Sequence, residues 1–180
     1  MTTWTQDDER ALLDNIDRWI EREVKPIARE HDQEDKYPHA LVEQMKELGL
    51  FGATISPEYG GLGLPASIYA KIVIRVAGAW MAPVGIFNSH LIMASAIERC
   101  GTEEQKQRFL PLMATGEKRG GIALTEPNAG SDLQAIRSVA RREGEHYIIN
   151  GSKTWITNSL YGHMVLLLVK TDPEAKPRHK

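Results

Sequence analysis

Two short segments of the chain combine hydrogen-bond donors with an aromatic side chain. The first, ALTEPNAGSDL, covers residues 123–133, and the second, NGSKTWITN, covers residues 150–158. The Pro, Asn and Gly of the first segment favour turns, and successive N–H groups in such a turn can form a concavity that binds anions. Ser131 adds a hydroxyl there, while the second segment offers the indole of Trp155 and the hydroxyl of Thr157. A flat anionic cofactor such as a flavin nucleotide requires this combination of groups.

Each segment also has a simpler interpretation. The first could be a strand connection in which Asp132 caps a short turn, and local spacing alone favours this explanation. A strand over residues 153–157 would place Trp155 and Thr157 on one face, because side chains alternate along a strand. They could then contact a ring system, or Trp155 could belong to a sheet core with Thr157 at its rim. Pattern alone leaves both interpretations open.

Composition places the chain among ordinary globular proteins. The 180 residues are 42% hydrophobic and 26% charged, which is typical of a soluble protein of one or two domains. A net charge of -2 gives no electrostatic reason to expect nucleic acid or a membrane as a partner. Cys100 is the only cysteine, so cysteine-based metal sites are excluded. The start lacks the features of a secretory signal, and the apolar run at residues 164–169 is too short to cross a bilayer. We therefore expect a cytoplasmic protein.

Histidine offers no metal site either. The spacing of His31, His39, His90, His146 and His163 is not typical of metal ligands, and we expect most of them at the surface or in loops. No metal is therefore expected.

Helices are the elements that must position the two segments. Thr102 and Gln105 form a capping box, which predicts a further helix start, although Pro111 argues against a long uninterrupted helix there. Pro26 should kink or interrupt the first helix, and residues 57–65 are too rich in Gly and Pro to be anything but a loop. Apolar residues recur at helical spacing in four stretches, namely 7–30, 38–49, 67–79 and 84–99.

After Gly116 the pattern changes from helices to short strands. Residues 143–144 and 150–151 are turn signals. The helical part therefore ends near Glu117, and a β-rich part follows. The strands predicted from this pattern cover residues 122–124, 138–142, 145–149, 153–157 and 164–169.

Taken together, these features resemble the N-terminal half of the acyl-CoA dehydrogenase family of flavoproteins. The resemblance covers essentially the whole chain and reverses the preference for the simpler interpretations. It implies an α+β fold, with an N-terminal α-helical bundle domain over residues 1–117 and an incomplete β-barrel-like middle domain over residues 118–180. Four segments carry the resemblance, namely PEYGGLGL at 57–64, GTEEQKQRFLPLMATGE at 101–117, TEPNAGSD at 125–132 and NGSKTWITN at 150–158. The last two are highly specific when they occur in this order behind a helical domain.

The resemblance implies FAD as the cofactor. Thr125 would bond to the pyrimidine edge of the isoalloxazine, and Ser131 with the glycine before it would meet the pyrophosphate. Ser131 would also touch the acyl-CoA substrate. Trp155 would pack beside the ring, Thr157 would approach N5, and Ile156 would contribute a backbone contact. The cofactor-binding residues implied in this way are Ile122, Ala123, Leu124, Thr125, Gly130, Ser131, Trp155, Ile156 and Thr157.

The implied reaction is the α,β-dehydrogenation of an acyl-CoA thioester in fatty acid metabolism. A carboxylate removes the α-proton while a hydride passes from the β-carbon to flavin N5. In this family the base comes from a C-terminal domain beyond the present chain, so no catalytic residue is assigned, and Glu126 is not taken as the base. The resemblance also implies electron-transfer flavoprotein as the electron acceptor and a homo-oligomer as the full-length form.

Two alternatives stay open beside the dehydrogenase. One is a related flavin oxidase of the acyl-CoA oxidase or nitroalkane oxidase type. The other is a catalytically silent remnant that binds a partner through its helical surface. The residues PEAKPRHK end the chain where relatives continue into further strands, which would leave sheet edges unpaired. We therefore expect the 180 residues alone to be inactive and to bind FAD weakly or not at all.

Overall fold

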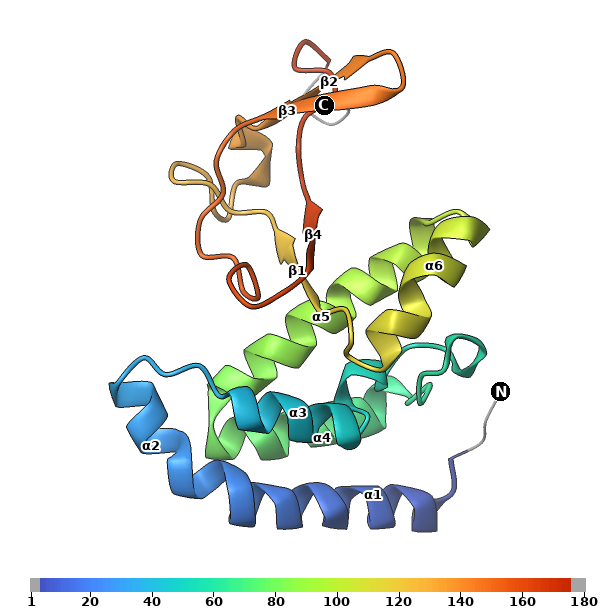
Figure 1. Cartoon of the computed structure of the whole chain (residues 1–180), viewed down its shortest axis with the longest axis vertical. Coiled ribbons are helices and arrows are strands. Elements are labelled where there is room, and N and C mark those ends of the chain that lie inside the picture. Colours follow the sequence, from blue (N-terminus) through green and yellow to red (C-terminus); the bar gives the residue numbers. More distant parts are fainter. Residues whose placement is uncertain (1–3, 176–180) are drawn as a thin grey trace.

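Helices occupy the chain as far as Ala114 in the computed structural model, which describes residues 4–175 (Figure 1). All four helical stretches predicted from the sequence are present, and a short α-helix follows the capping box. The helices are α1 (Gln6–Trp19), α2 (Lys25–Gln33), α3 (His39–Glu47), α4 (Ala66–Ala79), α5 (Met81–Cys100) and α6 (Glu103–Ala114). Short 3-10 turns cover Leu50–Gly52, Pro57–Tyr59 and Leu133–Ala135.

The long first helix is interrupted where proline predicts it. One turn of π-helix at Ile20–Val24 separates α1 from α2, and Pro26 occupies the first turn of α2. Proline has no N–H to donate to the preceding turn, so a local change of hydrogen-bond spacing just before it removes the conflict. The break is therefore caused by Pro26.

Helix α6 differs from its expectation at Pro111. The helix runs without a break to Ala114, with Pro111 inside it. Since Pro111 lies in the last turn, its missing N–H costs one hydrogen bond and the chain leaves the helix soon afterwards. The expected interruption was wrong because the proline lies too near the end to divide the helix.

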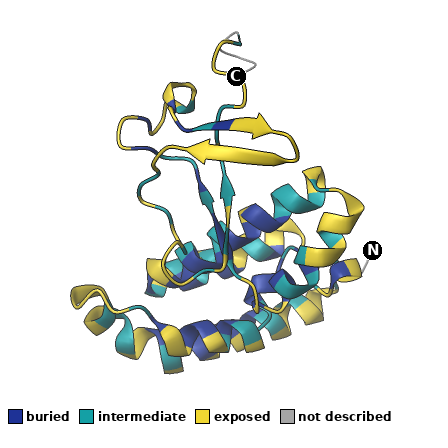
Figure 2. Cartoon of the chain, turned by 45° about the horizontal axis from the view of Figure 1, so that its top comes forward, coloured by how far each residue is buried: buried dark blue, intermediate teal, exposed yellow. Residues whose placement is uncertain are grey.

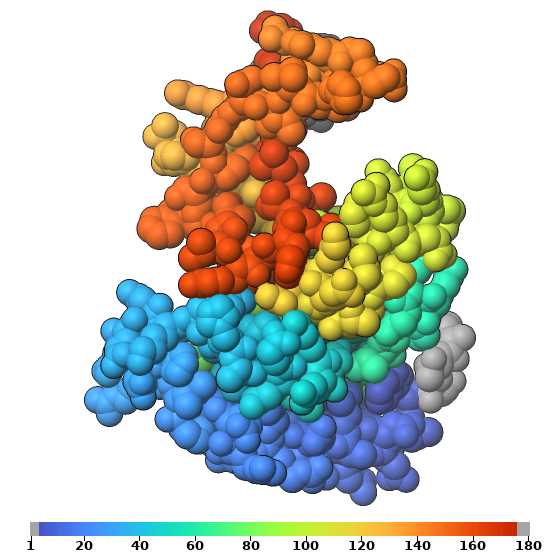
Figure 3. Space-filling model, in the orientation of Figure 1, coloured from blue at the N-terminus to red at the C-terminus, as the bar shows by residue number. Residues whose placement is uncertain are grey.

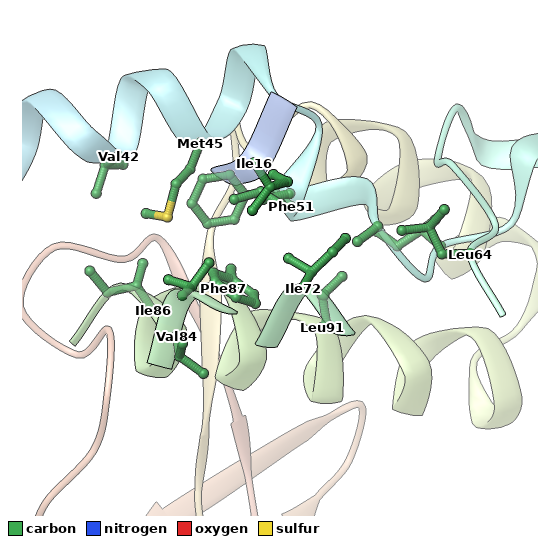
Figure 4. Packing of buried hydrophobic residues seen from close by; sticks show 14 of the residues in the cluster. Ile16, Val42, Met45, Phe51, Leu64, Ile72, Val84, Ile86, Phe87 and Leu91 are labelled. Carbon is green, nitrogen blue, oxygen red and sulfur yellow. The ribbon is translucent and has the colours of Figure 1, made fainter. Parts of the chain in front are cut away.

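The hydrophobic core lies among the helices. Helix α5 packs against α4, α6 and the first strand, while α1 packs against α4. Figure 4 shows Met45 of α3, Ile72 of α4 and Phe87 of α5 directed into this core, together with Phe51 from the turn after α3. Figure 2 shows the same distribution, with buried residues on the inner faces of the helices and exposed residues on the outer faces.

A buried histidine links the helices to the first strand. His90 of α5 is fully buried, contrary to the surface position expected for most histidines. Its Nδ1 accepts the N–H of Gly120 at 3.3 Å, so Nε2 carries the proton and lies 3.1 Å from the carbonyl oxygens of Phe51 and Met113. Burial, the largest effect, and the charge of Arg119 lower the pKa of His90 to about 4, although the bonds to Met113 and Phe51 oppose the change.

The β part consists of two small sheets that do not close. Strands β1 (Gly120–Ala123) and β4 (Met164–Leu167) are parallel, with Gly120 opposite Met164 and Ala123 opposite Leu167. Strands β2 (Val139–Glu143) and β3 (His146–Asn150) form an antiparallel hairpin. A bridge between Val139 and Lys170 connects the hairpin to the chain beyond β4. The hairpin stands away from the helices, and Figure 3 shows a hollow between it and α6.

This architecture confirms the predicted α+β fold with an incomplete β part. Four predicted strands are present, each within about two residues of its expected bounds. The strand predicted at 153–157 is wrong, because Trp155 and Asn158 have positive φ angles of 57° and 66°, which an extended strand does not allow. The alternation argument that put Trp155 and Thr157 on one face therefore fails. The domain boundary after residue 117 stays a prediction.

The capping box at the start of α6 gives a test of local stability. Thr102 accepts the N–H of Gln105 at 3.2 Å, and the Gln105 side chain accepts the N–H of Thr102 at 2.9 Å. We expect Thr102→Ala to lower the free energy of unfolding by about 1 kcal/mol in a denaturant titration. Thr102→Ser keeps the hydroxyl and should stay close to the unsubstituted chain. Equal losses for the two variants would contradict a capping role.

Candidate functional site

The structure brings the two sequence segments side by side. Strand β1 leads into the first segment, where the carbonyl oxygen of Leu124 accepts a hydrogen bond from Lys153 Nζ at 2.9 Å. The carbonyl oxygen of Thr125 accepts the N–H of Thr154 at 3.0 Å. These bonds hold residues 124–125 against residues 153–154, immediately before Trp155.

The first segment folds back on itself in a tight turn. Glu126 and Ala129 exchange two backbone hydrogen bonds of 2.8 and 3.1 Å. Asp132 then accepts the N–H of Gln134 at 3.1 Å and caps the 3-10 turn, as its simpler interpretation predicts. Gly130 and Ser131 lie exposed between these two structures, so their backbone and hydroxyl groups are open to a ligand.

Trp155 lies at the surface instead of in a sheet core. The residue is 89% exposed, and its backbone has the left-handed φ of 57°. A bulky residue in this conformation is strained, and such strain concentrates at ligand sites. The interpretation of Trp155 as a sheet-core residue is therefore wrong, and its ring is free to pack against a ligand.

The turn that follows Trp155 is tied to both the helices and β1. The Asn158 amide donates to the carbonyl oxygens of Ile86 at 2.9 Å and Gly120 at 2.8 Å. The chain also approaches Gly121 so closely that a Cβ there would lie 2.2 Å from the carbonyl oxygen of Thr157. Because Gly121 lacks a Cβ, the backbone of the exposed Thr157 can approach the start of β1 closely.

Glu126 holds a buried ion pair that the sequence did not reveal. Its Oε1 lies 2.9 Å from Lys153 Nζ and accepts the N–H of Ser138 at 2.9 Å, while Oε2 accepts the N–H of Arg137 at 2.6 Å. Its side chain is 7% exposed and that of Lys153 is 9% exposed. Burial alone would raise the pKa of Glu126, but the contacts with Ser138, Arg137 and Lys153 outweigh it and hold the pKa at about 2. Glu126 is therefore a charged structural acceptor, unsuited to take a proton from a substrate.

Two hollows flank the turn after Trp155. One, of about 420 Å³, lies between this turn and the helices, with Ile156 and Thr157 on one side and Tyr37 and Trp80 on the other. The second, of about 430 Å³, lies on the strand side, and Ile156 again lines it. Ile156 thus borders open space on two sides, and Thr157 borders the hollow on the helix side.

The predicted site residues are only partly gathered in one place. Ile122 and Ala123 lie in β1, and the hydrogen bonds of residues 124–125 connect them to the segment that carries residues 155–157. Among the described residues, no hydrogen bond joins Gly130 or Ser131 to that segment. The structure therefore links residues 122–125 to residues 155–157, while a common site with Gly130 and Ser131 stays a prediction.

Metal-ligand clusters and membrane-spanning helices are both absent from residues 4–175. Within that range, no group of three or more His, Cys, Asp or Glu side chains could hold a metal ion. No helix there combines the length and apolar character needed to cross a membrane.

Comparison with known families agrees with this arrangement. Residues 6–117 match the family model for the acyl-CoA dehydrogenase N-terminal domain. Residues 121–180 match the model for the acyl-CoA dehydrogenase middle domain. The chain belongs to the acyl-CoA dehydrogenase family. The resemblance noted from the sequence segments is thereby confirmed.

Individual acyl-CoA dehydrogenases and related chains show the same likeness. The short-chain specific acyl-CoA dehydrogenase of Clostridium acetobutylicum is 41% identical over 92% of this chain and 44% of its own length. A chain in the structure of the electron transferring flavoprotein of Acidaminococcus fermentans has a TM-score of 0.86 at 31% identity, over 96% of this chain and 45% of that one. An acyl-CoA dehydrogenase from Bacillus anthracis in complex with FAD has a TM-score of 0.82 at 35% identity, over 93% and 30%. The chain spans less than half the length of the curated relatives it matches.

Proposed function

We propose that this chain forms one wall of the FAD site of an enzyme that dehydrogenates acyl-CoA thioesters at the α,β position. The observation that carries the proposal is the pairing of residues 124–125 with residues 153–154, which leaves Trp155 exposed beside the turn. Family membership and the FAD-bound relative support the same cofactor.

The groups on this wall fit a flavin nucleotide. The exposed indole of Trp155 supplies an apolar plane for the isoalloxazine. Thr125 and Thr157 supply hydroxyl groups, while Gly130 and Ser131 offer exposed donors for the pyrophosphate. The residues present therefore suit the isoalloxazine and the pyrophosphate of FAD.

The residues of the chain orient the reactants. FAD, when bound, supplies the acceptor for a hydride from the β-carbon of the substrate. Thr157, held close to the start of β1, would bond near the reacting edge of the ring, and Ser131 would contact the acyl-CoA. Fixed donors of this kind cost no reorganisation during the reaction. Both carboxylate oxygens of Glu126 accept hydrogen bonds from Arg137, Ser138 and Lys153, so Glu126 is unsuited to act as the base. The family resemblance implies a base from a C-terminal region of the whole enzyme.

The partners of the whole enzyme follow from the same proposal. We infer an acyl-CoA substrate, electron-transfer flavoprotein as the electron acceptor, a homo-oligomeric full-length form and a role in fatty acid metabolism. The likeness to a chain in the electron transferring flavoprotein structure supports a flavin-dependent electron acceptor. The cytoplasmic location stays a prediction from composition.

Reduction of the bound flavin tests the proposed function. A form of the protein that includes a C-terminal bundle is purified with FAD and titrated anaerobically with straight and branched acyl-CoA thioesters. We expect at least one thioester to bleach the oxidised-flavin absorbance. A flavin that no thioester bleaches would contradict the dehydrogenase, and fast reoxidation by oxygen after bleaching would favour the oxidase.

Substitution of Trp155 tests the wall itself. We expect Trp155→Ala to weaken FAD binding by about tenfold, because stacking of an aromatic pair contributes about 0.5–1.5 kcal/mol beyond area burial. Trp155→Phe keeps an aromatic plane and should lose much less. The dissociation constants are measured by quenching of flavin fluorescence. Equal affinity in the alanine variant and the unsubstituted protein would place the flavin elsewhere.

A further inference from the structure

We propose that Glu126 and Lys153 are positioning residues that set the spacing between the two flavin-binding segments. This inference rests on the proposed function, since it assigns the pair a role in binding FAD. The two side chains join the turn of residues 126–129 to the segment that leads into Trp155. Neither side chain need contact the cofactor to act in this way.

The pair connects several backbone segments through two side chains. Lys153 Nζ donates to the carbonyl oxygen of Leu124 at 2.9 Å as well as to Glu126. Glu126 in turn accepts hydrogen bonds from the N–H groups of Arg137 and Ser138, just before β2 begins. The loop after β1, the segment before Trp155 and the approach to β2 are therefore joined at one point.

Burial keeps Glu126 and Lys153 together, so that the pair acts as a fixed connection, called the joint below. The side chain of Lys153 is 9% exposed and that of Glu126 is 7% exposed. By contrast, the ion pair between Lys25 of α2 and Glu21 of the π turn lies at the surface, with side chains 51% and 64% exposed. A buried charge left without its partner is strongly unfavourable, so the two groups must remain together. An exposed pair separates readily and contributes little.

The Glu126–Lys153 pair lies next to the residues that are proposed to bind the flavin. Lys153 precedes Trp155 by two residues, and Glu126 follows Thr125 directly. The left-handed backbone of Trp155 persists only when surrounding contacts enforce it. The joint and the bond from Thr154 to Thr125 supply such contacts immediately before Trp155, and so they fix the backbone that carries the indole relative to the first segment.

The experiment measures FAD binding and stability separately in the full-length, FAD-bound protein. The variants are Glu126→Gln, Lys153→Met, their combination and Lys153→Arg, with Lys25→Met as the matched exposed control. Flavin fluorescence gives the dissociation constant for FAD. Visible circular dichroism of FAD-saturated protein reports the surroundings of the ring, and thermal unfolding of the apoprotein reports stability.

We expect each single neutral substitution to weaken FAD binding by about tenfold or more, and to alter the flavin dichroism at saturation. The double variant should lose less than the two single losses added together, because both remove the same interaction. Lys153→Arg keeps the charge and should fall between the unsubstituted protein and Lys153→Met. Lys25→Met should match the unsubstituted protein.

Other outcomes separate this inference from the proposed function. Variants that unfold at lower temperature yet keep the dissociation constant within about twofold and the same dichroism would show a purely structural pair. Should Lys153→Met fail to fold, Lys153→Arg decides: about threefold weaker binding supports the inference, and unchanged binding overturns it. An unsubstituted protein that binds no FAD would overturn the proposed function, and the inference with it.

Discussion

Replacing Phe51 with alanine will lower the free energy of unfolding by about 3–5 kcal/mol. Phe51 is fully buried in the turn after α3, and its ring meets His90 edge to face at 5.2 Å between centroids. The chain at Gly116 packs so closely on this ring that a Cβ there would lie 2.6 Å from it. Because bonds to the carbonyl oxygens of Phe51 and Met113 hold the His90 ring in place, it cannot move far into the cavity.

Denaturant titration of the 180-residue chain measures this loss. Ile74→Ala is the control, since Ile74 lies on the outer face of α4 with 69% of its side chain exposed, and it should change stability by less than about 0.5 kcal/mol. A loss under about 1.5 kcal/mol for Phe51→Ala would mean that the core relaxes around the cavity. Because small domains have only about 5–15 kcal/mol in total, the expected loss is a large fraction of the whole.

Acid should destabilise the chain through His90. Its pKa is lowered from 6.5 to about 4 in the fold, so the unfolded chain binds more protons than the folded chain between these values. Stability is therefore unaffected by His90 above about pH 6.5 and falls as the pH drops toward 4, by about 3 kcal/mol in all. Below pH 4 both states are protonated and the loss stops growing. Protonation of Nδ1 would also remove the acceptor for Gly120.

Unfolding titrations at a series of pH values, with His90→Gln for comparison, test this expectation. The variant should be less stable at pH 7, because backbone groups lose their partner, and its stability should change much less between pH 6.5 and 4.5. His146→Gln, at an exposed residue of β3, should keep the full dependence. If the free energy of unfolding of His90→Gln fell with pH as steeply as that of the unsubstituted chain, the acid sensitivity would belong to other groups. Glu126, with its pKa held near 2, adds to the loss only at lower pH.

Local sequence patterns predicted the helices well, because apolar residues recur along a helix at a regular spacing. The apolar stripe of α5 repeats every three or four residues, and the structure buries that face. His90 falls in this stripe, between Phe87 and Ala94, so its burial could have been inferred from the helical spacing. The expectation of a surface histidine followed the residue type alone.

The failures concern contacts between distant residues. Lys153 and Glu126 are 27 positions apart, and no local pattern shows that their side chains meet. The strand expected at 153–157 was wrong because Thr154 bonds to Thr125 and the chain then turns at Trp155. The two segments themselves were recognisable from residue types and order. Their mutual geometry required the tertiary fold.

The parallel pairing of β1 with β4 has a consequence for the order of folding. The two segments proposed to bind the flavin lie in the single connection between these strands, which must close before Ala123 can meet Leu167. Closing a long loop costs entropy, and such distant pairings form slowly, whereas contacts between successive helices form fast. We therefore expect the helices to assemble first, and β1 then to pack against α5. The site would be completed last, so a late folding intermediate should have a formed helical core and an unformed flavin wall.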